Sequence, residues 1–174
     1  MLRIGFVVIV ATMHLLSGCS GLELPGDYDE LTMEKRSYTG GQLRTDGFYY
    51  YHYSTPKGDR YDVYFLNRNG IVRYIGTPSS LDYVSNNASF PRERYYWGLF
   101  RISGDQLVFE RWHPGSGGYN PAFVHSGKIL DDTTFVITEQ ERSKTGEEGL
   151  LKESRTFHFQ EFSPKPDSTS KYIE

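Results

Sequence analysis

Seven aromatic and cationic residues in the middle of the 174-residue chain have the side chains expected of a small-molecule binding site. Aromatic rings offer broad apolar contact area, and a neighbouring guanidinium or imidazole can hold a polar head group. The same residue types also pack protein cores, so their chemistry leaves both roles open. The candidate ligand-binding residues are Tyr95, Trp97, Arg111, Trp112, His113, Tyr119 and Phe123.

Patterns that would predict catalysis or a resident metal ion are missing from the sequence. The histidines at 52, 113, 125 and 158 have no helix or short-loop ligand spacing, so no metal site is expected. No Gly-x-Ser-x-Gly elbow accompanies the serines, and the glycine-rich run 115–118 lacks the Lys-Ser/Thr ending of a phosphate loop. We therefore expect a protein that is not an enzyme and has no cofactor.

The composition narrows the classes of partner. A net charge of -3 and an isoelectric point near 6.0 give no basic footprint for nucleic acid. The single cysteine excludes an intrachain disulfide. Aromatic residues make up 16% of the chain, and their preference for pleated, half-buried surfaces favours an all-β core.

The elements that must position the candidate residues are strands. Runs rich in aromatic and β-branched residues alternate with turn formers, and the clearest hairpin reverses at Ser103-Gly104-Asp105. We expect an all-β fold, a single up-and-down antiparallel meander of about eight strands closed into a barrel, because closure removes exposed edges. The expected strands are 48–54, 60–66, 71–76, 95–102, 106–112, 122–130, 133–142 and 150–162, with short helical turns near 31–35 and 80–84.

The connections between these strands alternate in length. The turns at 67–70, 103–105 and 131–132 are tight, whereas 55–59, 77–93, 114–121 and 143–149 are longer. Alternate connections of a meander lie at opposite ends, so one end should carry the loops and bind. The first strand starts at the tight-turn end, which predicts that the N-terminal tether leaves there and that the loop-rich mouth faces away from a membrane.

The N-terminal residues predict the cellular compartment of the protein. Arg3 precedes the apolar run 4–16, whose length of about 13 residues is too short to span a bilayer but suits a signal peptide. The next residues, Leu16-Ser17-Gly18-Cys19, resemble the lipobox of bacterial lipoproteins. The resemblance implies cleavage before Cys19, lipidation of Cys19 and anchoring in the cell envelope, with Ser20 favouring the outer membrane of a Gram-negative host. The alternative is an ordinary signal peptide with a free thiol.

The chain then divides into four parts. We expect a lipoprotein signal peptide at 1–18, a lipidated N-terminus and tether at 19–42, a barrel at 43–162 and a flexible C-terminal tail at 163–174.

The barrel segment also carries a diffuse resemblance to lipocalin-like bacterial lipoproteins. Gly47 and Tyr49 stand where lipocalins have Gly-x-Trp on the first strand, and Arg155 matches the basic residue of the last strand that packs over the Trp. The resemblance implies a lipocalin-like barrel that binds small apolar or amphipathic ligands. It rests on the segments 46–50, 96–105 and 127–137.

Two functions remain open from the sequence. The first is a membrane-anchored barrel, attached through lipid on Cys19, that binds a small apolar or amphipathic molecule at its loop-rich mouth. The second is an adhesion or assembly module of the cell envelope that binds a protein or glycan and holds no internal ligand.

Overall fold

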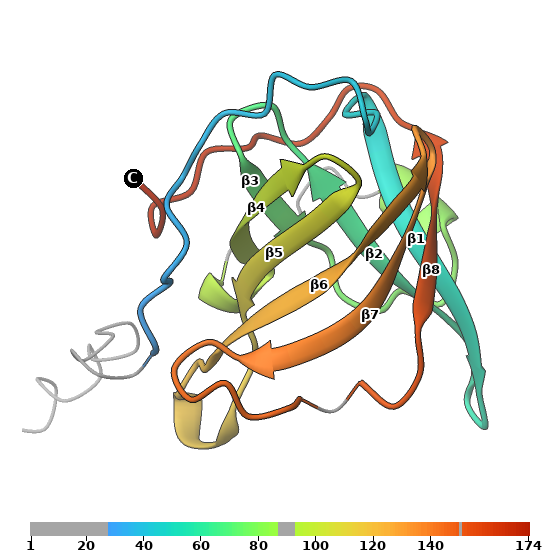
Figure 1. The fold of residues 1–174 in the computed structure, drawn as a ribbon. Helices are drawn as coiled ribbons and strands as arrows, with labels where there is room; N and C mark the ends of the chain where they lie inside the picture. Colours follow the sequence, from blue (N-terminus) through green and yellow to red (C-terminus); the bar gives the residue numbers. More distant parts are fainter. Residues whose placement is uncertain (1–27, 87–92, 150) are drawn as a thin grey trace, which may run out of the picture.

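The protein is a closed barrel of eight antiparallel strands (Figure 1). The computed structural model describes residues 28–86, 93–149 and 151–174. Each strand pairs with the next in sequence, and the last pairs with the first, so the expected up-and-down meander is confirmed. The strands are β1 (Gly47–Thr55), β2 (Gly58–Leu66), β3 (Ile71–Tyr74), β4 (Trp97–Ser103), β5 (Gln106–Trp112), β6 (Ala122–Asp131), β7 (Thr134–Arg142) and β8 (Arg155–Glu161).

Among the residues that the structure describes, helical structure is confined to short turns in the connections. These are α1 (Asp82–Asn86), close to the expected turn, and the 3-10 turns η1 (Arg94–Tyr96) and η2 (Ser116–Gly118). In the described ranges, no helix has the length and apolar character needed to cross a membrane.

The two ends of the barrel differ in their connections. The tight-turn end carries the β2–β3, β4–β5 and β6–β7 turns, and the loop-rich end carries the other connections (Figure 1). One expectation about length is wrong. The β1–β2 connection is a two-residue turn, Pro56-Lys57, because Thr55 and Gly58 still pair across it.

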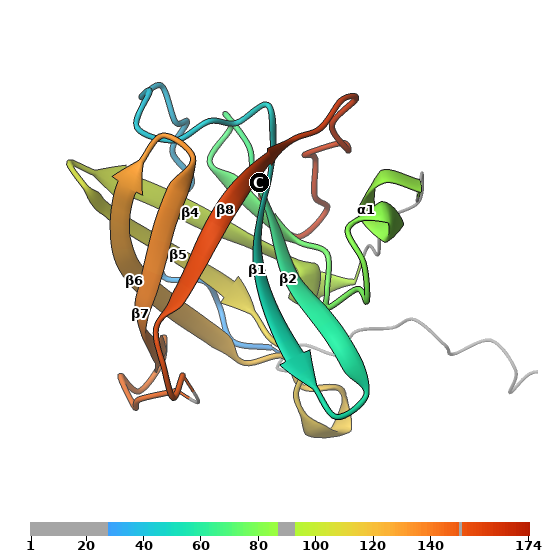
Figure 2. The same ribbon diagram turned by 90° about the vertical axis from the view of Figure 1, so that its right-hand side faces the viewer.

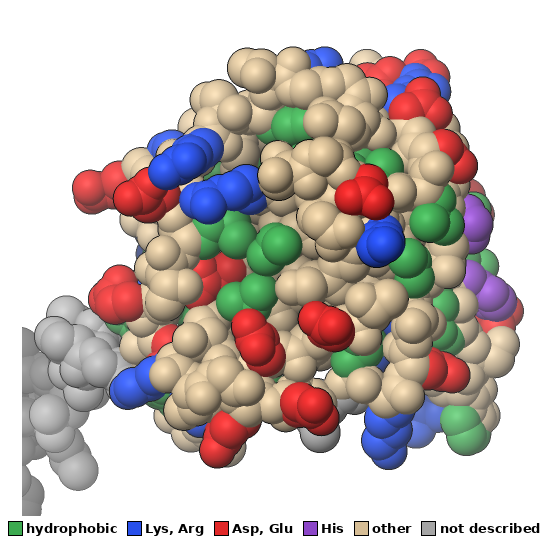
Figure 3. Space-filling model, in the orientation of Figure 1, with side chains coloured by type: hydrophobic (Ala, Val, Ile, Leu, Met, Phe, Trp, Pro, Cys, Tyr) green, Lys and Arg blue, Asp and Glu red, His purple; other side chains and the backbone are tan. Residues whose placement is uncertain are grey.

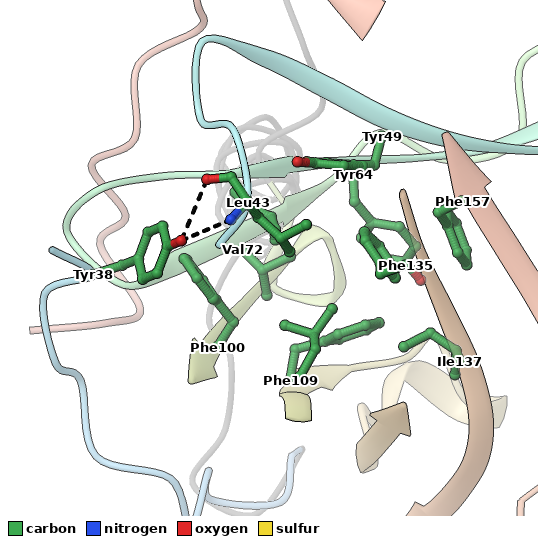
Figure 4. Close-up of a cluster of buried hydrophobic side chains, with 12 residues drawn as sticks. Tyr38, Leu43, Tyr49, Tyr64, Val72, Phe100, Phe109, Phe135, Ile137 and Phe157 are labelled. Carbon is green, nitrogen blue, oxygen red and sulfur yellow. Dashed lines mark hydrogen bonds between the residues drawn. The ribbon is translucent and has the colours of Figure 1, made fainter. Parts of the chain in front are cut away.

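The interior near the tight-turn end is filled by large apolar side chains (Figure 4). Tyr64 of β2 contacts Phe109 of β5 with ring centroids 5.1 Å apart, and Tyr49 of β1 contacts Phe135 of β7 at 5.0 Å. Neither pair belongs to neighbouring strands, so both contacts cross the barrel interior. Tyr38 and Leu43, from the segment before β1, join the same cluster and close this end.

Two further apolar layers cover the outside of the sheet. The outer residues of β1 and β2, including Phe48, Val63 and Phe65, pack with Val84 of α1, which lies outside the barrel beside β2 (Figure 2). The second layer covers the outer face of β3–β5. Its buried members are Ile71, Trp97, Leu99, Trp112, Ala122 and Ile173, with Tyr28, Leu31 and Met33 packed against them.

Residues 28–43, here called the N-terminal strap, connect the two ends of the barrel along its outer face (Figure 1). Tyr28 forms a β-bridge with Asn120 at the loop-rich end, and Leu43 lies in the tight-turn core. The sequence-based prediction that the tether leaves from the tight-turn end is therefore wrong. It overlooked that the chain crosses the whole barrel before β1 begins.

The strap is extended, so the helical turn expected near 31–35 is also wrong. The carboxylate of Glu110 on β5 accepts hydrogen bonds from the backbone N–H groups of Thr32 (3.0 Å) and Met33 (2.7 Å). The Glu110 side chain thus accepts the N–H hydrogen bonds that backbone carbonyl groups would accept in a helix.

The segment 163–174, expected to be a flexible tail, lies against the barrel as well. The Lys165 ammonium donates to the carbonyls of Thr45 and Leu66, the latter at 2.9 Å. Ile173 is 8% exposed and packs in the outer layer over β3–β5. Both terminal segments therefore take part in covering the sheet.

The β1–β8 seam differs from the arrangement implied by the lipocalin resemblance. Tyr49 pairs directly with Phe159, and the guanidinium of Arg44 lies 4.4 Å from the Phe159 ring centre. Arg155 precedes Phe159 by four residues on β8 and lies 5.8 Å from the Tyr51 ring. The expected packing of Arg155 over Tyr49 is therefore wrong, and Arg44 provides the cation near Tyr49.

Candidate functional site

The interior near the loop-rich end holds polar and charged side chains instead of apolar ones. We call this group the polar belt. Its members come from five strands or their immediate ends and contact one another across the interior. They are Asp62 on β2, Tyr74 on β3, Arg111 and His113 on and just after β5, His125 on β6 and Arg155 on β8.

An ion pair spans the belt from β2 to β8. Arg155 Nη1 lies 3.0 Å from Asp62 Oδ2, and the Tyr74 hydroxyl donates to Asp62 Oδ1 at 3.1 Å. Burial raises the pKa of the Asp62 carboxyl, although the positive charge of Arg155 and the Tyr74 hydrogen bond partly offset that effect. Asp62 is buried, whereas the Arg155 side chain is 38% exposed, so Arg155 is the member of this ion pair that reaches solvent.

Arg111 lies deeper and is held on several sides. Its Nε donates to the Tyr64 hydroxyl at 3.3 Å, and its Nη1 donates to the carbonyls of Tyr95 (3.2 Å) and Trp112 (3.0 Å). The guanidinium carbon also lies 4.2 Å from the ring centre of Tyr74, a distance typical of a cation–π contact. Arg111 thereby joins the interior of the barrel to the β3–β4 connection.

The two belt histidines face each other. His113 Nε2 and His125 Nε2 lie 3.0 Å apart, the rings are nearly parallel, and His125 stacks on Phe109. A hydrogen bond at this distance requires one ring to donate and the other to accept, which suits two neutral imidazoles. Burial lowers the pKa of both histidines well below the usual value, and the Arg111 guanidinium acts in the same direction.

Burying the charged side chains of the polar belt costs free energy of folding. Two guanidiniums and one carboxylate lie in or at the edge of the interior, and removing charges from water costs several kcal/mol per ion before pairing offsets it. The same barrel fills its other end with Leu107, Phe135 and Ile137, so apolar filling is compatible with this architecture. Perturbed titratable groups gathered at one end are a recognised mark of functional sites.

The seven residues predicted from the sequence do not form one site. Arg111 and His113 belong to the belt, and Phe123 packs beside His113 with ring centres 4.7 Å apart. The other four lie elsewhere. Trp97 and Trp112 belong to the outer apolar layer, Tyr95 and Tyr119 lie in connections, and the Trp112 indole donates to the Asp29 carbonyl at 2.6 Å.

Three belt residues, Asp62, Tyr74 and His125, were missed as site candidates, and Arg155 was assigned a structural role only. Alternation places Asp62 on the face opposite to Val63 and Phe65. That pattern could have revealed it, but both faces of β2 are buried, so inward and outward positions look alike in the sequence.

A surface pocket of about 230 Å³ also opens at the loop-rich end, outside the barrel. It is lined by Tyr28, Tyr95 and Asn120 together with the charged side chains of Glu93 and Arg94. The Arg94 guanidinium lies between the rings of three aromatic residues, at 3.5 Å from Tyr28, 4.6 Å from Tyr172 and 5.0 Å from Trp112. Two of the predicted residues, Tyr95 and Trp112, therefore contribute to this second location.

Among residues 28–86, 93–149 and 151–174, no group of three His, Cys, Asp or Glu side chains is arranged to hold a metal ion.

The fold and the site together define the structural class of this protein. It is a closed eight-stranded up-and-down barrel with an apolar interior at one end and a polar belt at the other. In comparisons with known proteins, the chain matches no protein-family model, no curated protein and no solved structure.

Proposed function

We propose that the barrel binds a small amphipathic molecule at its loop-rich end while a lipid on Cys19 anchors it to a membrane. The observation that carries the binding proposal is the polar belt, whose charged groups the fold does not need for packing. Cys19 lies outside the described residues, so the anchor rests on the lipobox resemblance.

The composition of the belt favours an anionic or strongly polar head group. With both histidines neutral, two guanidiniums face a single carboxylate, which leaves one positive charge in excess. Arg155 is the accessible cation, and a guanidinium binds carboxylate or phosphate oxygens in a two-pronged geometry. Tyr51, partly exposed, supplies apolar contact beside Arg155, and Phe123, also partly exposed, supplies it beside His113.

The test uses the soluble chain that begins at Ser20. The protein is titrated with an anionic amphiphile, anilinonaphthalene sulfonate, and with the neutral probe N-phenylnaphthylamine, and each affinity is measured by fluorescence. We expect Arg155→Met to weaken binding of the anionic probe about tenfold, the effect of losing roughly one charge-assisted hydrogen bond. The neutral probe should bind almost unchanged.

Arg101→Met is the matched control, because Arg101 lies exposed on β4 near the opposite end. Equal affinity of wild type, R155M and R101M for the anionic probe would argue against the belt as the binding site. Mass spectrometry of the natively purified soluble chain provides the second readout, and a co-purified amphiphile is the expected result.

A second candidate, a module that binds a glycan or protein, is favoured by the outer pocket. Tyr28 and Tyr95 offer ring faces while Glu93, Arg94 and Asn120 offer hydrogen-bonding groups, a combination suited to sugar hydroxyls. Tyr95→Ala should then abolish binding to a glycan array and leave the affinity for the anionic amphiphile unchanged.

A further inference from the structure

The position at which the described chain reaches the barrel is fixed by several contacts. Tyr28 bridges to Asn120, and the Asp29 N–H donates to the Asn120 carbonyl at 3.0 Å. The Trp112 indole N–H donates back to the Asp29 carbonyl at 2.6 Å. The backbone at residues 28 and 29 is therefore attached to the β5–β6 connection, which belongs to the loop-rich end.

The Asp29 side chain strengthens this attachment. Its carboxylate accepts hydrogen bonds from the Tyr119 hydroxyl and, at 3.3 Å, from the Ala122 N–H, and it lies 3.5 Å from the Arg142 guanidinium. Asp29 is only 5% exposed, and these contacts hold its pKa below the usual value despite the opposing effect of burial. The carboxylate thus stays ionised and attached at neutral pH.

The chain length before this attachment is short. Cys19 precedes Tyr28 by nine residues (28 − 19 = 9), and nine residues span at most about 30 Å when fully extended. A nine-residue strand such as β1 is itself about 30 Å long. The tight-turn end could therefore face the lipid only with the tether almost fully extended, whereas the loop-rich end can face it at any tether length, so chain entropy favours the loop-rich end.

We propose that the loop-rich end of the barrel faces the lipid surface in which Cys19 is anchored. This orientation rests on the proposed lipid anchor, and it is opposite to the one expected from the strand count alone. It gives the polar belt a membrane-side position, so an amphipathic ligand can pass between bilayer and barrel without crossing bulk water.

The charged side chains at the loop-rich end neither favour nor oppose this orientation strongly. The connections carry Lys57 beside Asp59 and Lys144 close to Glu147 and Glu148. Acidic and basic side chains are likewise interspersed along the lower edge of Figure 3, where this end lies. The orientation should accordingly come from the tether, and it should change little with salt or with anionic lipid content.

The test measures energy transfer to the membrane from two positions. A fluorescent unnatural amino acid replaces Ser116 at the loop-rich end or Asp105 in the β4–β5 turn, both exposed residues, so that no second cysteine is needed. The lipidated proteins are reconstituted into phosphatidylcholine vesicles that contain a rhodamine-labelled acceptor lipid. We expect at least twofold greater transfer efficiency from position 116 than from position 105.

A variant with about 30 Gly/Ser residues inserted after Pro25 is the matched control, because a flexible linker of that length should remove the difference. Equal or reversed transfer in the unmodified, vesicle-bound protein overturns the orientation while the anchor stands. Vesicle flotation of wild type and Cys19→Ala tests the anchor separately. If wild type fails to float, the anchor and the orientation both fall, whereas the amphiphile titration of the soluble chain stays a valid test of ligand binding.

Discussion

His113 and His125 connect the protonation of single residues to the stability of the barrel. Burial lowers the pKa of both groups in the folded protein, whereas an unfolded chain binds their protons near pH 6.5. The folded state therefore loses stability as the pH falls below about 6.5, because protons bind preferentially to the unfolded chain. Asp62 acts in the opposite sense at lower pH, since its raised pKa favours proton binding by the folded state.

We predict that the free energy of unfolding decreases between pH 7.5 and pH 5.5 by about 1.4 kcal/mol for each of these two histidines. The double variant His113→Phe/His125→Phe should lose most of this pH dependence. Urea denaturation at the two pH values measures the effect, with His158→Gln as the control because His158 is exposed on β8. A double variant as pH-sensitive as wild type would contradict the assignment.

At the residue scale, the sequence identified the belt only in part. The sequence predicts Arg111 and His113 because they lie at the end of a clear hairpin strand next to aromatic residues, and both lie in the belt. Trp112 has the same sequence context but points outward, into the layer beneath the strap. Which face of β5 is interior depends on barrel closure, and a strand covered on both sides gives no alternation of polarity to show it.

Among the elements, the N-terminal strap depends on a buried carboxylate. Glu110 is 0% exposed, although it lies on the outer face of β5, and it receives the N–H groups of Thr32 and Met33 and the Thr32 hydroxyl at 3.2 Å. A buried carboxylate with three donors is strongly stabilised, while an amide in its place would direct its own N–H groups at one or more of these donors.

Glu110→Gln should therefore loosen the strap while leaving the barrel closed. We expect a destabilisation of about 2 kcal/mol and at least tenfold faster hydrogen exchange of the amides of residues 30–36. Mass spectrometry of exchanged peptides measures this, and peptides of β6 and β7 should stay unchanged. Glu34→Gln is the control, because Glu34 is exposed on the same strap and pairs only locally with Arg36. Equal exchange in both variants would show that Glu110 does not hold the strap.

The strands were more predictable than the segments that cover them. The expected strand 106–112 coincides with β5, and 60–66 differs from β2 only at its start, because aromatic and β-branched runs bounded by turn formers are local signals. The strap has Gly and acidic residues, and the segment 163–174 has Pro and acidic residues, in both cases without a period. Their positions follow from contacts with distant residues such as Glu110 and Leu66, which composition does not show.

On the scale of the whole molecule, the apolar zone that stabilises the barrel and the proposed binding zone lie at opposite ends of its axis. The tight-turn end is packed with aromatic rings and closed by Tyr38 and Leu43 (Figure 4), while the loop-rich end tolerates buried charge. Stability supplied at one end can offset the desolvation cost of the belt at the other. The strap joins the two zones, because it starts beside the loop-rich end and finishes inside the apolar core.

The packing at the tight-turn end predicts that the smallest stably folded chain must include Tyr38 and Leu43. Leu43 is 1% exposed and donates its N–H to the Tyr38 hydroxyl at 2.8 Å, and the Tyr38 ring packs on Phe100. Removing both residues exposes apolar surface worth roughly 4 kcal/mol at about 2 kcal/mol per large side chain. A chain beginning at Arg44 should therefore lose a substantial share of the 5–15 kcal/mol typical of such a domain.

Urea denaturation followed by near-ultraviolet circular dichroism compares three soluble chains, beginning at Ser20, Tyr28 and Arg44. The first two should unfold in single transitions with midpoints that agree closely, because both keep the whole strap. The third should unfold at much lower urea or lack fixed aromatic packing even in buffer. If it instead retains the stability of the longer chains, the strap is a covering and not part of the cooperative core. The closed sheet of β1–β8 would then be self-sufficient, and the polar belt would need no stability from the strap to offset its cost.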